Sequence, residues 1–335
     1  MSERPHDRRF PHDPFAFGWY QIDYGDQLKR GQVKPWRAFG RDFVLWRDAD
    51  GAPHLFDAFC PHLGAHLGHG GRVEGNVLRC PFHGWRFDEA GRCAGIPYSP
   101  EARLGASRNL TSWPVVERNG LLLGWWHPDG AAPAFDTPVL PEWGDRGWSR
   151  YRRHHWRANT VWQEIQENIV DSTHFHYLHG VESLAVVDRC DPIGPVLDVN
   201  ILHRFKTPVG VEDGFIQTTL YGPFFATVRF RIGDVAEILF VDAVTPIETD
   251  VVDVRFSLLA KLDGVRIPDM SLALVDEAIR QVSEDVPIWN HKMHWQTPSL
   301  APGDGPVMKF RNWAKQFRNY DEIKDTTRNE PVVAI

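Results

Sequence analysis

Two short half-sites constrain the fold of this 335-residue chain more than any other feature. The first is Cys60-x-His62 and the second is Cys80-x2-His83, and 17 residues separate His62 from Cys80. Each half-site offers one thiolate and one imidazole, and these ligand types suit zinc and iron–sulfur centres. The chain is therefore expected to bring two loops, separated in sequence, together around one metal centre.

The four donors predict a Rieske [2Fe–2S] cluster, in which two cysteines bind one iron and two histidines bind the other. A structural zinc site with two cysteines and two histidines is the alternative. Zinc fingers usually place both histidines on one helix, whereas each half-site here contributes one cysteine and one histidine. We therefore expect Cys60, His62, Cys80 and His83 to hold the cluster.

The N-terminal part of the chain has an all-β pattern. Residues 17–130 consist of short apolar runs bounded by turns, and the runs at 43–46 and 55–56, with Asp and Gly between them, predict a hairpin. We expect residues 17–130 to form the domain that carries the cluster. Residues 1–16 are predicted to be an N-terminal tail, and the Pro- and Gly-rich residues 131–148 a linker.

The C-terminal part, residues 149–325, combines helix and strand signals. Periodicity predicts helices at 161–178 and at about 268–285, and a region rich in Val, Ile, Phe and Thr predicts strands over 195–260. The chain is therefore predicted to be α+β: an all-β domain, then a domain with a long antiparallel sheet and helices. Residues 326–335 are predicted to be a C-terminal tail.

Composition excludes several classes of partner. The net charge is −7, from 44 acidic and 37 basic residues, and no dense Lys/Arg run is present, so a nucleic-acid partner is not expected. No apolar stretch is long enough for a transmembrane helix, and the N-terminus has no apolar segment typical of a secretory signal. Four cysteines in so long a chain do not form a disulfide framework. We therefore expect a cytoplasmic protein.

A second group of carboxylates and histidines indicates an enzyme. At about 100° per residue, Glu164, Glu167, Asp171 and His174 share one stripe of the predicted helix. For the two glutamates alone, a solvated acidic face is the simpler interpretation. His174 and His179 do not share a face on an unbroken helix, so a distortion close to His179 is needed to bring them together.

Two histidines need one carboxylate to complete the 2-His-1-carboxylate triad of a non-haem Fe(II) oxygenase. In the second predicted helix, Asp285 lies on the edge of the apolar stripe, whereas Glu284 points almost opposite to it. A carboxylate on an inward face needs a partner or a metal. The alternative is that Asp285 only closes the helix, because Pro287 disfavours helical geometry in the residue before it. We predict His174, His179 and Asp285 as iron ligands.

These motifs resemble those of the Rieske non-haem iron oxygenases, over about residues 19–317. The resemblance is closest to the oxygenase component of 3-ketosteroid 9α-hydroxylase and its sterol-modifying relatives. It rests on the cluster motif, on Asp171-x2-His174-x4-His179, and on the run from Glu284 to Trp289, where the family has a carboxylate ligand shortly before an Ile-Trp pair. Residues 181–260 match poorly.

The resemblance implies an architecture and a reaction. It implies a helix-grip, START-like catalytic domain and a homotrimer in which His83 of one subunit approaches Asp171 of the next. Asp171 would then bridge the two centres and hold His174, although a solvated carboxylate is the alternative. Asn168 is either a neighbour of the iron or an ordinary polar helix residue. The implied reaction is O2 activation and hydroxylation of a steroid or sterol-like apolar substrate.

Electrons are expected from another protein. No G-x-G-x-x-G motif follows a predicted strand, so the chain has no evident dinucleotide or flavin site. A separate NAD(P)H-dependent reductase, acting directly or through a ferredoxin, is the expected donor. Two alternatives stay open: a Rieske oxygenase that hydroxylates or demethylates an aromatic or other small substrate, and a Rieske electron carrier without oxygenase activity.

Overall fold

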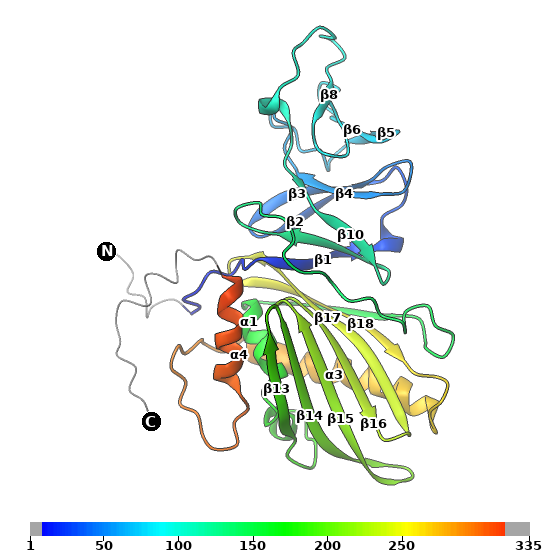
Figure 1. Ribbon diagram of the computed structural model, residues 1–335, viewed down its shortest axis with the longest axis vertical. Helices are drawn as coiled ribbons and strands as arrows, with labels where there is room; N and C mark the ends of the chain where they lie inside the picture. Colours follow the sequence, from blue (N-terminus) through cyan, green and yellow to red (C-terminus); the bar gives the residue numbers. More distant parts are fainter. Residues whose placement is uncertain (1–8, 319–335) are drawn as a thin grey trace. The chain divides into compact units, whose positions relative to one another are not determined.

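The computed structural model describes residues 9–318, which divide into two compact units. Residues 19–134 form the first unit, and residues 9–18 together with 135–318 form the second. Figure 1 shows the elements of both units, coloured by their position in the sequence. The predicted C-terminal tail, residues 326–335, and the start of the predicted N-terminal tail lie outside the described residues.

The first unit is built from short antiparallel strands, as its turn-rich sequence predicts. The predicted hairpin is present: Phe43 pairs with Asp57 and Leu45 with Leu55. Its turn is closed by the side chain of Asp48, whose Oδ1 accepts the Gly51 N–H at 2.7 Å. The strands form three sheets, in the orders β1-β11-β10, β2-β3-β4-β9 and β5-β6-β7-β8.

The regular elements of this unit are short. They are β1 (Gly18–Tyr24), η2 (Gly25–Gln27), β2 (Val33–Ala38), β3 (Arg41–Arg47), β4 (Pro53–Asp57), β5 (Arg72–Glu74), β6 (Val77–Arg79), β7 (Arg86–Phe87), β8 (Cys93–Gly95), η3 (Ala106–Arg108), β9 (Ser112–Trp113), β10 (Val115–Arg118) and β11 (Leu121–Trp126). An apolar core lies beneath the β5–β8 sheet, and Trp46, Phe56, Leu78 and Phe87 in it are fully buried. This core supports the loops that carry the two half-sites.

The second unit contains a seven-stranded antiparallel sheet in the order β12-β18-β17-β16-β15-β14-β13. The order confirms the predicted long antiparallel sheet, which is visible as the curved layer in Figure 1. Its strands are β12 (Arg152–Ala158), β13 (Val186–Ile193), β14 (Val196–Thr207), β15 (Gly210–Tyr221), β16 (Phe225–Ile232), β17 (Ala236–Glu248) and β18 (Val251–Ala260).

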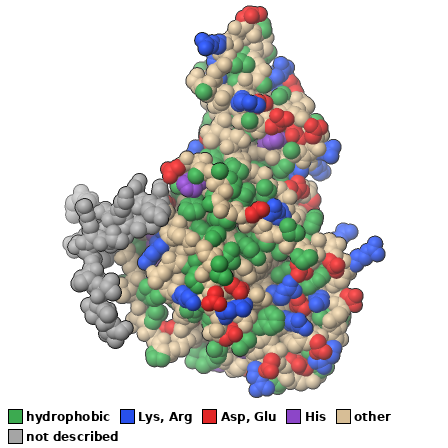
Figure 2. All heavy atoms as spheres, in the orientation of Figure 1, with side chains coloured by type: hydrophobic (Ala, Val, Ile, Leu, Met, Phe, Trp, Pro, Cys, Tyr) green, Lys and Arg blue, Asp and Glu red, His purple; other side chains and the backbone are tan. Residues whose placement is uncertain are grey.

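The two faces of this sheet differ. In β14, burial alternates with every residue, and the buried Leu197, Val199 and Ile201 face the helices. The outer face carries cross-strand ion pairs such as Arg204–Asp213, with 3.2 Å between Nε and Oδ1. Figure 2 shows basic and acidic side chains interspersed on the visible face of the molecule. The alternation of buried and exposed residues therefore places apolar side chains on the inner face, where they form a core and line a cavity.

The helices of the second unit lie against the inner face of the sheet or at its edge. They are α1 (Trp162–Gln166), η4 (Glu167–Ile169), α2 (His174–Tyr177), α3 (Pro268–His291), α4 (Val307–Ala314) and η5 (Lys315–Phe317). The long helix α3 packs on β12, β17 and β18, and α1 packs on β17. None of the helices formed by residues 9–318 combines the length and apolar character needed to cross a bilayer.

Both predicted helices needed correction. The segment 161–178 is three short helical pieces. The chain leaves the helical path after Val170, where the backbone of Gly305 packs so closely that a Cβ there would lie 1.6 Å from the Val170 carbonyl oxygen. Helix α3 begins at Pro268, as predicted, but continues past Pro287 to His291. The guanidinium of Arg9 supports this extension by donating to the Trp289 and Lys292 carbonyls.

Candidate metal centres and substrate pocket

The two half-sites of the first unit adopt the same loop geometry. In each loop a glycine N–H donates to the cysteine carbonyl, at 3.0 Å from Gly64 to Cys60 and at 3.2 Å from Gly84 to Cys80. Both glycines have left-handed φ angles, 73° for Gly64 and 72° for Gly84, which other residues rarely adopt. The repeated turn brings all four predicted donors to one end of the unit.

The donor side chains fit a [2Fe–2S] cluster. The rings of His62 and His83 lie 4.6 Å apart, and His62 stacks on Trp85. The Nδ1 atom of His62 is buried without a hydrogen-bond partner among the described residues. Burial and the neighbouring Cys80 thiol raise the pKa of the Cys60 thiol to about 12, so a thiolate pair here needs a cation. Two thiols and two imidazoles match the Rieske donor set.

The second unit brings His174, His179 and Asp285 together. One ligand atom from each lies within 4.8 Å of the other two. The two imidazole rings are 5.1 Å apart, and Nε2 of His179 is 3.5 Å from Oδ1 of Asp285. These are the donors of a 2-His-1-carboxylate iron site.

Local chain geometry explains how two histidines five residues apart meet. Helix α2 contributes His174 and ends at Tyr177. The chain leaves the helix at Leu178, so His179 lies just beyond the helix end, and Gly180, with a φ of 71°, redirects the chain after it. Asp285 comes from the buried side of α3. The distortion that the spacing requires is therefore a helix end followed by a left-handed glycine.

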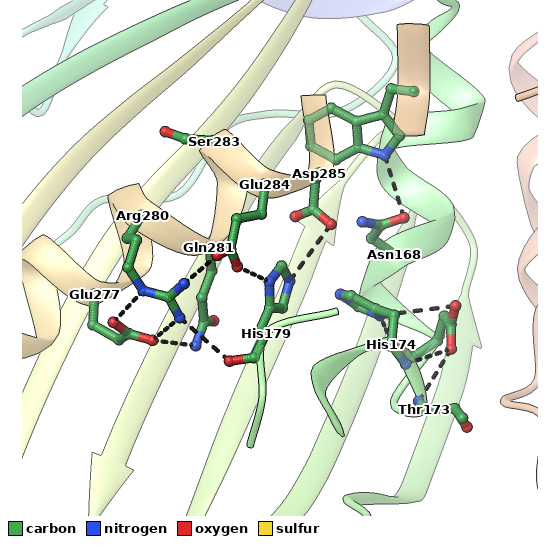
Figure 3. Close-up of polar contacts among 12 residues, drawn as sticks. Asn168, Thr173, His174, His179, Glu277, Arg280, Gln281, Ser283, Glu284 and Asp285 are labelled. Carbon is green, nitrogen blue, oxygen red and sulfur yellow. Dashed lines mark hydrogen bonds and ion pairs between the residues drawn. The ribbon is translucent and has the colours of Figure 1, made fainter. Parts of the chain in front are cut away.

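Glu284 holds the other side of the His179 ring, as Figure 3 shows. Its Oε2 lies 3.0 Å from Nδ1 of His179, and Arg280 forms an ion pair with the same carboxylate. Arg280 also donates to the His179 carbonyl at 3.3 Å. Against the opposing effect of burial, the Asp285 and Glu284 carboxylates raise the pKa of His179, so this site favours a positive charge.

The sequence interpretation placed Glu284 away from the site, and that was wrong. Consecutive helix residues project about 100° apart, and the His179 ring lies in the angle between Glu284 and Asp285. The apolar stripe alone does not locate a ring supplied by another segment. An adjacent acidic pair at the edge of the stripe was the available signal.

Asp171 contacts His174 in two ways. Its backbone carbonyl lies 2.5 Å from Nδ1 of His174, and its Oδ2 lies 3.8 Å from the same nitrogen. Its Oδ1 accepts the Thr173 N–H at 3.1 Å in the turn that precedes α2. Although burial opposes ionisation, the bonds from His174 and Thr173 lower the pKa of Asp171. Its side chain is 43% exposed, which leaves one carboxylate edge accessible.

The predicted acidic face is not solvated. Glu164 and Glu167 are buried, and each is paired with cations. Glu167 binds Arg311, with 2.9 Å between Oε1 and Nη2, and Glu164 binds Lys292 at 2.8 Å and Nδ1 of His294 at 2.5 Å. These ion pairs connect the start of the site segment to the elements that follow α3.

His12 joins Glu164 and His294 in a second group of three possible metal donors. In this group the Lys292 ammonium already neutralises the carboxylate of Glu164. Burial and the nearby Arg318 lower the pKa of His12 to about 2, so the imidazole is neutral. We interpret this group as a buried ion-pair network.

A cavity extends from the three-residue site between the helices and the sheet. The atom-free space there is about 850 Å³ when the open solvent at its mouth is included. Asn168 lines it and accepts a hydrogen bond from Nε1 of Trp289 at 3.4 Å. Its wall is mainly apolar: Ile165, Ile169, Phe175, Ile201, Ile216, Val228, Phe230, Phe240, Phe256, Ala278, Val282 and Trp289.

The Rieske [2Fe-2S] domain model matches residues 18–114, and the model described as 3-Ketosteroid 9alpha-hydroxylase C-terminal domain matches residues 124–318, more than half of the chain. The chain is a Rieske oxygenase. Members of this family use a [2Fe–2S] cluster and a mononuclear iron, and both donor sets are present in this oxygenase. One relative is named as an oxygenase component, a name that implies a separate reductase for that relative.

Curated relatives extend over nearly the whole oxygenase. Cholesterol 7-desaturase of Caenorhabditis elegans is 31% identical over 333 residues, covering 90% of this chain and 77% of the relative. The oxygenase component of 3-ketosteroid-9-alpha-monooxygenase from Rhodococcus rhodochrous is 29% identical, covering 93% and 86%. Among solved structures, dicamba monooxygenase bound to dicamba superposes with a TM-score of 0.74 at 18% identity, covering 92% and 98%. That last likeness concerns the fold and confirms the predicted class.

Proposed function

We propose that this chain is the terminal oxygenase of a steroid- or sterol-oxidising system. The observation that carries the proposal is an apolar cavity with a 2-His-1-carboxylate group in its wall. Relatives named for 3-ketosteroid and cholesterol substrates support the substrate class. No lysine or arginine is among the described residues that line the cavity, and these residues are the common partners of a carboxylate-bearing substrate.

We assign the donors accordingly. Cys60, His62, Cys80 and His83 hold the cluster. His174, His179 and Asp285 hold the mononuclear iron. When bound, this iron supplies the O2 chemistry that functionalises an unactivated C–H bond.

The chain's own groups prepare this site. Glu284 accepts the Nδ1 proton of His179, and the Asp171 carbonyl accepts the Nδ1 proton of His174. Each contact fixes a tautomer with an unprotonated Nε2, which is the form that binds metal. The apolar wall orients a flat substrate and excludes water from the reacting carbon.

We further propose that Asp171 bridges the two centres between subunits of a homotrimer. The support is its half-exposed carboxylate beside His174. His83 of the neighbouring subunit is the proposed contact. Asn168 is proposed to neighbour the iron from the cavity wall. A ferredoxin is a proposed intermediate carrier between the reductase and the cluster.

Oxygen uptake by the iron-loaded protein tests the function. A generic reductase, NAD(P)H and panels of neutral steroids and aromatic acids are supplied, and products are identified by mass. Steroid-dependent uptake supports the proposal. A mass gain of one oxygen indicates hydroxylation, and a loss of two hydrogens indicates desaturation. Uptake with aromatic acids alone contradicts the substrate class. Cluster reduction without uptake, and no iron beyond the cluster's pair, indicates an electron carrier.

A further inference from the structure

Asp242 is an unusual residue in the wall of the apolar cavity. It lies on β17 and is only 5% exposed. Its cross-strand neighbours are Ala226 on one side and Phe256 on the other, and neither offers a polar partner. Its Oδ1 has no hydrogen-bond partner within the described part of the chain. A buried polar atom without a partner is rare in folded proteins and needs an explanation.

Gln166 lies beside Asp242 and is not itself among the residues that line the cavity. It comes from α1, which packs on β17, and it is fully buried. Neither polar atom of its amide has a hydrogen-bond partner among residues 9–318 that satisfies ordinary geometry. Burial raises the pKa of Asp242 to about 7, and the nearby Gln166 offsets this effect only in part. A carboxyl group and an amide thus lie buried together with unused hydrogen-bonding capacity.

We propose that Asp242, assisted by Gln166, binds an uncharged oxygen of the substrate, a ketone or a hydroxyl. The inference rests on the proposed function and names the part of the substrate that this end of the cavity recognises. A carboxylic acid donates through its O–H and accepts through its C=O, and a primary amide does both as well. A ketone or a hydroxyl of the substrate can therefore form a hydrogen bond with Asp242, whereas a substrate with only hydrocarbon at this end leaves Asp242 without one.

A cationic substrate is the competing occupant. An ionised Asp242 facing Phe230, Phe240 and Phe256 would suit a quaternary ammonium group. The structure favours the neutral oxygen for two reasons. Among residues 9–318, Asp242 has no charged partner that stabilises its carboxylate, and the Gln166 side chain beside it is an uncharged amide.

Equilibrium binding to the fully metal-loaded protein tests the assignment. The probes are androst-4-ene-3,17-dione and its two analogues that each lack one ketone. For wild type we expect one analogue to bind at least about tenfold more weakly than the diketone, because sites built around a hydrogen bond reject ligands that lack it. Asp242→Leu should remove this discrimination, and Asp242→Asn should retain it within about threefold. Thr218→Val, which changes another polar residue of the wall, should leave it intact.

The remaining outcomes are decisive. Gln166→Leu is a second variant, on a different element, and should reduce the same discrimination if Asp242→Leu does not fold. Unchanged discrimination in the leucine variants overturns the inference and leaves the steroid proposal standing. No binding of any steroid to wild type defeats the proposed function itself. Binding of benzyltrimethylammonium that is lost in Asp242→Asn identifies the cationic occupant instead.

Discussion

Glu284 and Asp285 are consecutive residues of α3, and they contact opposite nitrogens of one imidazole. Glu284 Oε2 lies 3.0 Å from Nδ1 of His179, and Asp285 Oδ1 lies 3.5 Å from Nε2. One carboxylate therefore fixes the ring and its tautomer, and the other shares the metal-facing side. Arg280 ties Glu284 in place. Carboxylates that orient a ligating histidine usually raise its basicity and the affinity of the metal site.

Replacing Glu284 should weaken iron binding without disturbing the cluster. We expect Glu284→Ala to reduce the Fe(II) affinity of the mononuclear site by about 10- to 100-fold. Titration of Fe(II) into protein depleted of mononuclear iron measures this, and the visible spectrum reports the cluster. Asp276→Asn is the matched control, since Asp276 is an exposed acid of the same helix that pairs with Arg152. Wild-type affinity in Glu284→Ala would show that this contact is incidental.

Asp171 should matter for electron transfer more than for metal binding. Asp171→Asn retains a side-chain oxygen that can accept the Thr173 N–H, whereas Asp171→Ala loses this hydrogen bond and should lower stability by about 1 kcal/mol. We expect both variants to keep both metals and to lose turnover. Asp188→Ala, at an exposed acid of β13 that accepts from Asn200, is the control. Substantial turnover in Asp171→Asn would contradict the proposed bridge.

Residues that the sequence predicts as iron ligands lie together in the structure, whereas the helices that carry them differ from the prediction. The spacing of Cys60, His62, Cys80 and His83 indicates their chemistry without any knowledge of the fold. The helix predicted over 161–178 is interrupted after Val170, beside the backbone of Gly305, and the periodicity of one segment does not record which distant residue packs against it. Tertiary packing decides such breaks.

The wall of the cavity was the least predictable part. Strand β17 does not show the usual alternation of buried and exposed residues, because almost every one of its residues is buried. Nothing in the sequence therefore distinguishes an inward Asp242 from an outward one. Its face is determined by strand register, since it pairs with Phe256 of β18 and Ala226 of β16. Register depends on partners distant in sequence.

The raised pKa of Asp242 predicts how stability depends on pH. The folded state holds this proton up to about pH 7, whereas an unfolded Asp releases it near 3.8. Between these values the folded state binds more protons, so Asp242 makes the protein less stable as pH rises. The stability of Asp242→Asn relative to wild type should therefore increase by about 1 kcal/mol from pH 6 to pH 8. Thermal unfolding at both pH values measures it, and a constant difference would exclude the shift.

The two proposed metal centres should be separable by substitution. We expect His62→Ala to abolish the Rieske EPR signal and to leave the mononuclear iron, because the cluster loses one of its two histidines. His174→Ala should do the reverse, removing one iron per chain while the cluster stays reducible. His69→Ala is the control, since His69 is exposed and lies between the half-sites. Iron and acid-labile sulfide per chain, measured with EPR, distinguish these outcomes. Loss of both metals in either variant, with the fold intact by circular dichroism, would mean that the centres are not independent.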